Sequence, residues 1–130
     1  MDRQNVTSGT PWEKRVAYSR AVRKGPYVAV SGTTASDEDG VMQCPGDVYG
    51  QASFIFKKIE TALSECGAKM SDVIRTRMYV TDISRWEEVG RAHQECFEGI
   101  CPASTLVEVS NLVDEQLLVE IEVDAVVDAD

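Results

Sequence analysis

Residues that bind metals are scarce in this chain. It has one histidine, His93, and four cysteines, and no two cysteines stand in a CxxC pattern. Structural zinc sites are usually built from closely spaced cysteine and histidine ligands. We therefore expect no metal and no cofactor. The cysteines are expected to be free thiols in a reducing compartment, and they are Cys44, Cys66, Cys96 and Cys101.

Long apolar runs are also missing. No stretch approaches the roughly 20 apolar residues that a membrane-spanning helix needs. Residues 1–10 are polar and lack the apolar segment of a secretory signal. These two absences predict no membrane partner and a cytoplasmic location.

Positive charge is in short supply. The chain has 13 lysines and arginines against 22 acidic residues, which gives a formal net charge of −9. A surface this acidic repels phosphate backbones, so we do not expect a nucleic-acid partner. The closely spaced Arg15, Arg20, Arg23 and Lys24 are interpreted as solvated side chains of a strand pair.

What is present fits one globular domain spanning residues 1–130. The hydrophobic content of 43% is ordinary, and the length allows a real core without disulfides or metals. Residues 1–13 are predicted to be an irregular lead-in. Arg15–Arg23 alternates loosely and Pro26–Ser31 is apolar and β-branched, and the Lys24-Gly25-Pro26 turn between them predicts a hairpin.

The spacing of apolar residues then changes from the two-residue period of a strand to the period of a helix. Apolar residues recur at helical spacing between Asp47, which suits the first turn, and Gly67, which suits the position past the last turn. Val73–Thr81 is predicted to be a strand. Ser84-Arg85-Trp86-Glu87 resembles a capping box that opens a second helix, and Gly99 closes it.

Two closing strands complete the chain. They lie within Pro102–Val109 and Leu117–Val127, separated by a turn. The predicted order is β-β-α-β-α-β-β, which favours an α+β fold with a mixed sheet and two helices on one face.

The second face of this sheet is charged. Glu120, Glu122 and Asp124 alternate with apolar residues on the last strand, and Arg75 and Arg77 accompany Tyr79 on the third. One interpretation is an exposed face with solvated ion pairs of little energetic weight. The other is an oligomer interface that places paired charges at clefts between subunits.

Five segments, in order and spacing, resemble the RidA/YjgF family, also called the L-PSP endoribonuclease or translation-inhibitor group. The resemblance covers about Val16 to Val127. The segments are Ala17-Tyr18-Ser19, Val30-Ser31-Gly32, RTRMYVTD at Arg75–Asp82, PASTLVEV at Pro102–Val109, and VEIEVDA at Val119–Ala125.

The resemblance implies a chorismate-mutase-like α+β fold and a homotrimer with three clefts between subunits. It also implies hydrolysis of reactive enamines or imines, such as 2-aminoacrylate, to a 2-keto acid and ammonia. In such members an arginine after the Pro-Ala of the fourth-strand motif binds the substrate carboxylate. A tyrosine, a Ser-Gly pair and a last-strand glutamate complete the cleft.

Carried over to this chain, the tyrosine matches Tyr18, the pair matches Ser31 and Gly32, and the glutamate matches Glu120. The arginine is absent, because Ser104 stands in its place. Serine cannot form the two parallel charge-assisted bonds of a guanidinium.

Other side chains are candidates to replace that contact. Arg20 and Arg77 are each expected either to reach into the cleft or to pair with a glutamate. Ser104 and Thr105 are expected either to donate hydrogen bonds to a polar ligand or to bond to backbone. Glu120 activates water if its pKa is raised, and is a poor base if it pairs with arginine.

Three functions remain open at this point. They are a hydrolase of enamines or imines, a non-catalytic binder of a small polar or carboxylated metabolite, and an endoribonuclease or translation inhibitor. The acidic net charge disfavours the third, and Ser104 favours the second over the first.

Overall fold

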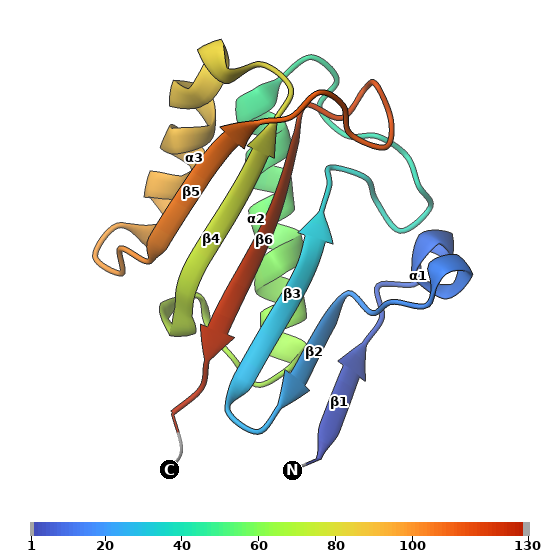
Figure 1. Cartoon of the computed structure of the whole chain (residues 1–130), viewed down its shortest axis with the longest axis vertical. Coiled ribbons are helices and arrows are strands. Elements are labelled where there is room, and N and C mark those ends of the chain that lie inside the picture. The colour runs from blue at the N-terminus through green and yellow to red at the C-terminus, as the bar shows by residue number, and fades with distance from the viewer. Residues whose placement is uncertain (1, 129–130) are drawn as a thin grey trace.

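A computed structural model describes residues 2–128. Six strands form one sheet in the order β1-β2-β3-β6-β4-β5, and two long helices cover one of its faces (Figure 1). All neighbouring strands are antiparallel except β4 and β5, which are parallel. The elements are β1 (Arg3–Val6), α1 (Pro11–Val16), β2 (Ala21–Lys24), β3 (Tyr27–Thr33), α2 (Val48–Glu65), β4 (Val73–Val80), α3 (Trp86–Phe97), β5 (Ala103–Glu108) and β6 (Val119–Val126), with 3-10 turns at Met70–Asp72 and Ile83–Arg85.

The core lies between the sheet and the two long helices. Strand β6 alternates strictly between buried and half-buried residues, so Val119, Ile121 and Val123 face the helices. The apolar face of α2 packs against them through Ile55 and Phe56, both almost completely buried. The opposite face of the sheet is not covered by any helix of the described chain (Figure 1).

The predicted α+β fold is confirmed, with two helices on one face of a mixed sheet. The β2–β3 hairpin turns at Gly25, whose φ is +61°. Helix α2 begins at Asp47, whose carboxylate accepts a hydrogen bond from the Gly50 N–H at 2.9 Å. Gly67 lies just past the end of α2 with a φ of +77°.

The prediction of an irregular lead-in over residues 1–13 is wrong. Arg3–Val6 forms β1, which pairs with β2 and so extends the sheet by a strand. Pro11 then opens α1 at a position that suits a proline, because the first helical N–H has no partner in any case. These elements depend on contacts with later residues, which local periodicity does not contain.

The predicted first strand over Arg15–Arg23 is also too long. Helix α1 takes up its first residues, and Ala17 ends the helix in the left-handed region with a φ of 64°. Tyr18 therefore lies in the connection to β2 rather than on a strand. Arg20 immediately precedes β2.

The predicted capping box at Ser84 is wrong as well. The Asp82 carboxylate accepts from the Ser84 N–H at 3.0 Å and caps the 3-10 turn that leads into α3. Trp86 is 53% exposed, whereas Val89, Ala92 and Phe97 are buried and form the face of α3 that packs into the core. Between residues 2 and 128, no helix combines the length and the apolar character that crossing a membrane requires.

Candidate functional site

Strand β3 carries a bulge where it faces β6. Val30 pairs with Val123 and Thr33 pairs with Ile121, so three steps on β3 match two on β6. The extra residue falls at Ser31 and Gly32. A bulge bends its strand and redirects the side chains around it, which is why bulges recur beside functional sites.

Gly32 makes room for the carboxylate of Glu120. A Cβ atom at Gly32 would overlap the Oε2 oxygen of Glu120 and lie 3.1 Å from its carboxyl carbon. Glu120 thus sits against the bare backbone of the bulge. Any side chain at position 32 would force this carboxylate to move.

The environment of Glu120 shifts the pKa of its carboxyl. Burial raises the pKa of the Glu120 carboxyl, the positive charge of Arg20 opposes this effect, and the negative charge of Glu122 adds to it. The net shift is upward. A carboxyl with a raised pKa is suited to both accepting and donating a proton near neutral pH.

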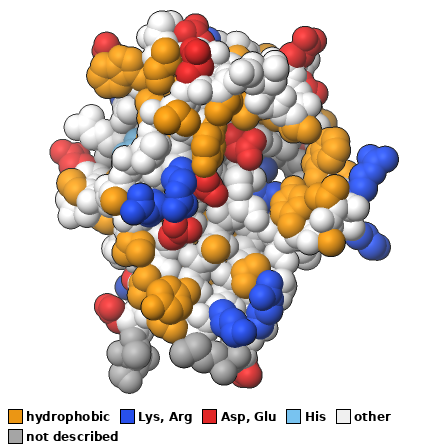
Figure 2. Space-filling view, viewed as in Figure 1, with side chains coloured by type: hydrophobic (Ala, Val, Ile, Leu, Met, Phe, Trp, Pro, Cys, Tyr) orange, Lys and Arg blue, Asp and Glu red, His pale blue; other side chains and the backbone are white. Residues whose placement is uncertain are grey.

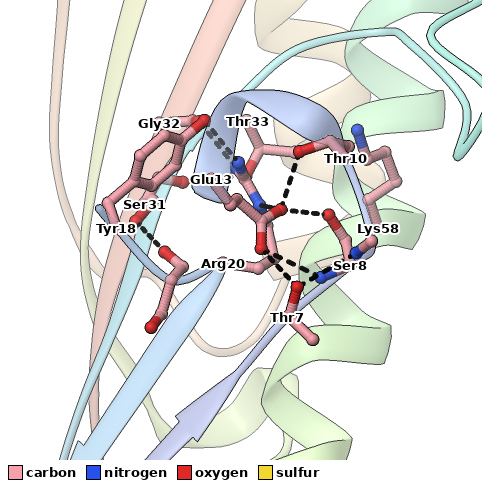
Figure 3. Close-up of polar contacts among 12 residues, drawn as sticks. Thr7, Ser8, Thr10, Glu13, Tyr18, Arg20, Ser31, Gly32, Thr33 and Lys58 are labelled. Atoms are coloured by element: carbon pink, nitrogen blue, oxygen red, sulfur yellow. Dashed lines mark hydrogen bonds and ion pairs between the residues drawn. The ribbon is translucent and has the colours of Figure 1, made fainter. Parts of the chain in front are cut away.

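Tyr18 and Ser31 lie close to the bulge. The Ser31 hydroxyl donates to the Ser19 carbonyl at 2.6 Å, and this bond ties β3 to the segment that carries Tyr18. The Tyr18 hydroxyl accepts from Arg20 Nη2 at 3.3 Å, while the side chain remains 38% exposed. The structure therefore brings Tyr18, Arg20, Ser31 and Gly32 together (Figure 3). Glu120 joins this cluster through its contact with Gly32.

Arg20 is a structural residue of this cluster. Its side chain is buried, and Nη1 donates to the Gly32 carbonyl at 2.7 Å and to the Thr33 hydroxyl at 3.0 Å. Its Nε lies 3.5 Å from Glu13 Oε2, as a buried ion pair without hydrogen-bond geometry. Because these contacts occupy the guanidinium, Arg20 holds the bulge and Tyr18 in place and does not extend toward a substrate.

Glu13 is the other half of this buried pair. Its carboxylate accepts hydrogen bonds from the Thr7 hydroxyl at 2.9 Å, from the Ser8 hydroxyl and N–H, and from the Thr10 hydroxyl at 2.9 Å. Burial raises the pKa of Glu13, but the bonds from Ser8, Thr7 and Thr10 outweigh it and hold that pKa below its ordinary value. The Glu13 carboxylate is therefore ionised and well bonded, which a buried charge requires.

Arg77 lies elsewhere on the open face and is paired. Its Nη1 lies 3.1 Å from Asp124 Oδ2 on the neighbouring strand β6. The next residue on this face, Tyr79, donates its hydroxyl proton to Glu122, and this bond is the main cause of a raised Tyr79 pKa. Figure 2 shows basic and acidic side chains next to one another on this face, with apolar side chains around them.

Ser104 and Thr105 lie on β5, at one edge of the sheet. Ser104 is the register partner of Thr76 and accepts a hydrogen bond from its hydroxyl at 2.8 Å, on the helix-covered face. Thr105 is the register partner of Arg77 and so faces the open side. Strand β4 separates β5 from β6, so one chain does not bring these two residues to Glu120.

The predicted site residues therefore fall into separate groups. Sequence reasoning missed Glu13 and Lys58, because their partners lie on other elements; the Lys58 amine donates to the Thr34 and Ser36 carbonyls. His93 is half-buried, and its Nε2 lies 2.9 Å from the Thr76 hydroxyl, which also donates to Ser104. Within residues 2–128, no three His, Cys, Asp or Glu side chains are grouped so that they could hold a metal ion.

Comparison with solved structures assigns the class of fold. The chain superposes on a Mycobacterium tuberculosis protein, described as a member of the YjgF family, with a TM-score of 0.88 and 49% identity, covering 97% of this chain and 100% of that one. The chain belongs to the RidA/YjgF family, because residues 10–127 match the family model described as Endoribonuclease L-PSP.

Two curated relatives agree with this assignment. An uncharacterized protein of Streptomyces coelicolor is 38% identical over 94% of this chain and 90% of its own length. A RutC family protein of Pyrococcus abyssi is 30% identical over 81% of this chain and 82% of its own length. Both alignments span most of the domain.

Proposed function

We propose that this chain forms a homotrimer that binds a small polar or carboxylated metabolite between subunits. In that cleft, Glu120 hydrolyses an enamine or imine to a keto acid and ammonia. The observation that carries the proposal is the half-buried Glu120 carboxyl, with its raised pKa, seated against Gly32 beside Tyr18.

A second subunit is needed to complete such a cleft. Within one chain, Ser104 and Thr105 are two strands away from Glu120, so they contribute to its ligand only if they come from a neighbouring copy. Tyr27 and Val107 lie on the open face of the sheet and are 65% and 41% exposed. Large apolar side chains on a face that no helix covers support its burial against other subunits.

The chemistry follows from a carboxyl that exchanges protons. Glu120 accepts a proton from a water molecule as the water oxygen bonds to the imine carbon, and the C=N double bond becomes a single bond. The same carboxyl gives this proton to nitrogen, which yields a carbinolamine. It then accepts the hydroxyl proton of the carbinolamine and transfers it to nitrogen, so that the C–N bond breaks, the carbonyl forms and ammonia leaves. Tyr18 lines the cleft and orients the substrate through its hydroxyl.

One specific observation favours a non-catalytic binder as the second candidate. The arginine that clamps the substrate carboxylate in deaminating members is replaced by Ser104, and neither Arg20 nor Arg77 is free to replace it. A carboxylated ligand would then be held by hydroxyls and backbone alone. Loss of a guanidinium clamp costs about 2–4 kcal/mol of binding.

Two supporting features concern partners and compartment. The formal charge of −9 and the carboxylates of the open face disfavour RNA as a substrate. All four cysteines are free thiols in the structure, which fits the reducing cytoplasm that we propose as the location.

The test is ammonia release from 2-iminobutyrate generated in solution, measured on the purified protein after its mass has been determined by light scattering. We expect three times the 14.3 kDa of one chain and a rate above the uncatalysed background. A trimer without rate enhancement, but with calorimetric binding of 2-oxobutanoate, would support the second candidate. A monomer would overturn the intersubunit cleft.

A further inference from the structure

A cavity of about 510 Å³ lies on the helix side of the molecule. It opens between the residues that follow β1, the outer part of α2, and the loop after β3. Its lining includes Ser8, Arg20, Ser36, Phe54 and Lys58. Arg20 separates this cavity from the Tyr18 and Gly32 cluster, and Lys58 lies on the other side of Arg20 (Figure 3).

The amine of Lys58 is held in this cavity by two backbone carbonyls. Its Nζ donates to the Thr34 carbonyl at 3.0 Å and to the Ser36 carbonyl at 2.7 Å. Within residues 2–128 it forms no ion pair with a carboxylate. Two N–H bonds and the bond to Cε leave one tetrahedral position of Nζ, which carries the lone pair when the amine is neutral.

The surroundings favour that neutral form. Burial lowers the pKa of the Lys58 amine to about 8, and the positive charge of Arg20 adds to this effect. The negative charges of Glu13 and Asp37 act in the opposite direction and are weaker. The pKa values of lysines that attack carbonyl carbons are lowered in the same way, by burial and by a neighbouring cation.

The walls of the cavity indicate the class of ligand. Val6, Phe54 and Ala62 supply apolar surface. The acidic residues that line the same space, Asp37, Glu38 and Glu65, outnumber the cations Lys58 and Arg20, of which Arg20 is already paired with Glu13. Apolar walls accept a short alkyl group, whereas the carboxylates repel an anionic ligand. A neutral aldehyde or ketone fits this lining better than a keto acid does.

We propose that this cavity is a second ligand site, in which Lys58 forms a reversible imine with a small neutral aldehyde or ketone. The lone pair of Nζ bonds to the carbonyl carbon, and one proton passes from nitrogen to the carbonyl oxygen to give a carbinolamine. The remaining proton of nitrogen then passes to the hydroxyl, which leaves as water as the C=N bond forms. Addition of water reverses every step, so no further reactant is needed.

This site is independent of the proposed deamination in the cleft. Both sites border on Arg20, but Lys58 takes no part in the Glu120 mechanism and Glu120 takes none in imine formation at Lys58. The cavity also requires no second subunit. A failure at Lys58 would leave the cleft chemistry untouched, and an inactive cleft would leave Lys58 reactive.

The test is reductive trapping on the full chain. Propanal and cyanoborohydride are added at pH 8, and propylated lysines are assigned by peptide mass spectrometry. Lys57 is the internal control, because it is the preceding residue of α2 and is exposed. The lowered pKa of Lys58 increases the fraction of its amine that is neutral at pH 8. The gain in rate from this fraction outweighs the loss in rate from the lower nucleophilicity of a less basic amine. We therefore expect Lys58 to react about tenfold faster than Lys57 or more.

Two variants and one substrate comparison complete the test. Lys58→Arg keeps the charge and should abolish the rapid trapping of propanal without changing ammonia release. Lys57→Arg should leave the rapid trapping at Lys58 intact. In the unaltered protein, trapping at Lys58 should rise with a midpoint near pH 8, a result that needs no variant to fold. Equal rates at Lys58 and Lys57 would overturn the proposal, and faster trapping of 2-oxobutanoate than of propanal would refute the neutral ligand class.

Discussion

Gly32→Ala is the perturbation that separates the fold from the proposed chemistry. The added Cβ would overlap Oε2 of Glu120 and lie 3.1 Å from its carboxyl carbon and 3.4 Å from its Cγ. The atoms in its way belong to the end of a flexible side chain, so Glu120 can rotate away. The expected result is a folded protein with a displaced carboxyl.

The expected effects of Gly32→Ala on stability and on turnover differ widely. An off-rotamer glutamate costs about 0.5–1.5 kcal/mol, and replacing glycine by alanine restores about 0.4–1 kcal/mol through the unfolded chain. The free energy of unfolding should therefore change by less than about 1 kcal/mol. Misplacing a catalytic group by about 1 Å costs on the order of 100-fold in rate, so turnover should fall by about that factor.

The assay is ammonia release from 2-iminobutyrate, together with urea unfolding of each variant. Gly90→Ala is the matched control, because a Cβ at Gly90 meets nothing nearer than Trp86 at 4.0 Å. It should keep full activity and gain some helix stability. Wild-type turnover in Gly32→Ala would refute the claim that the bulge positions Glu120, and an unfolded Gly32→Ala would refute the claim that the carboxyl is free to move.

Two further predictions concern the buried charges and the single histidine. Glu13→Gln leaves Arg20 buried without its carboxylate and should cost about 3 kcal/mol, which lowers the urea midpoint by on the order of 1.5 M; an unchanged midpoint would contradict the ion pair. Burial lowers the pKa of His93, so its stabilising contribution is complete above its ordinary value of 6.5 and is lost as the pH falls below it. The free energy of unfolding should drop by up to about 1 kcal/mol between pH 7 and pH 5.5 in the wild type but not in His93→Gln; equal drops in both would assign the change to other groups.

Much of the fold could be predicted from the sequence because its signals are local. The capping carboxylate of Asp47, the helical period that follows and the alternation of β6 each lie within one segment. Strand β1 could not be predicted in this way. Only one of its residues, Val6, is buried, and its stability comes from hydrogen bonds to β2.

The site shows the same division. The family resemblance points to Tyr18, Gly32 and Glu120, and the structure places them around one bulge. The sequence predicts that Arg20 either reaches into the cleft or pairs with a glutamate, but no local pattern indicates that this glutamate is Glu13. Glu13 is stabilised by Thr7, Ser8 and Thr10, three hydroxyl residues that resemble an ordinary polar loop until the chain is folded.

The trimeric hydrolase account depends most directly on the carboxyl of Glu120. The decisive measurement is the rate of imine hydrolysis by the purified protein for Glu120→Gln. Asp124→Asn is the control, because Asp124 lies on the same strand face and is paired with Arg77. We expect a loss of at least about 100-fold for Glu120→Gln, in the range by which positioned proton transfer accelerates reactions, and little change for Asp124→Asn. Equal turnover by wild type and Glu120→Gln would contradict the proposed role of Glu120.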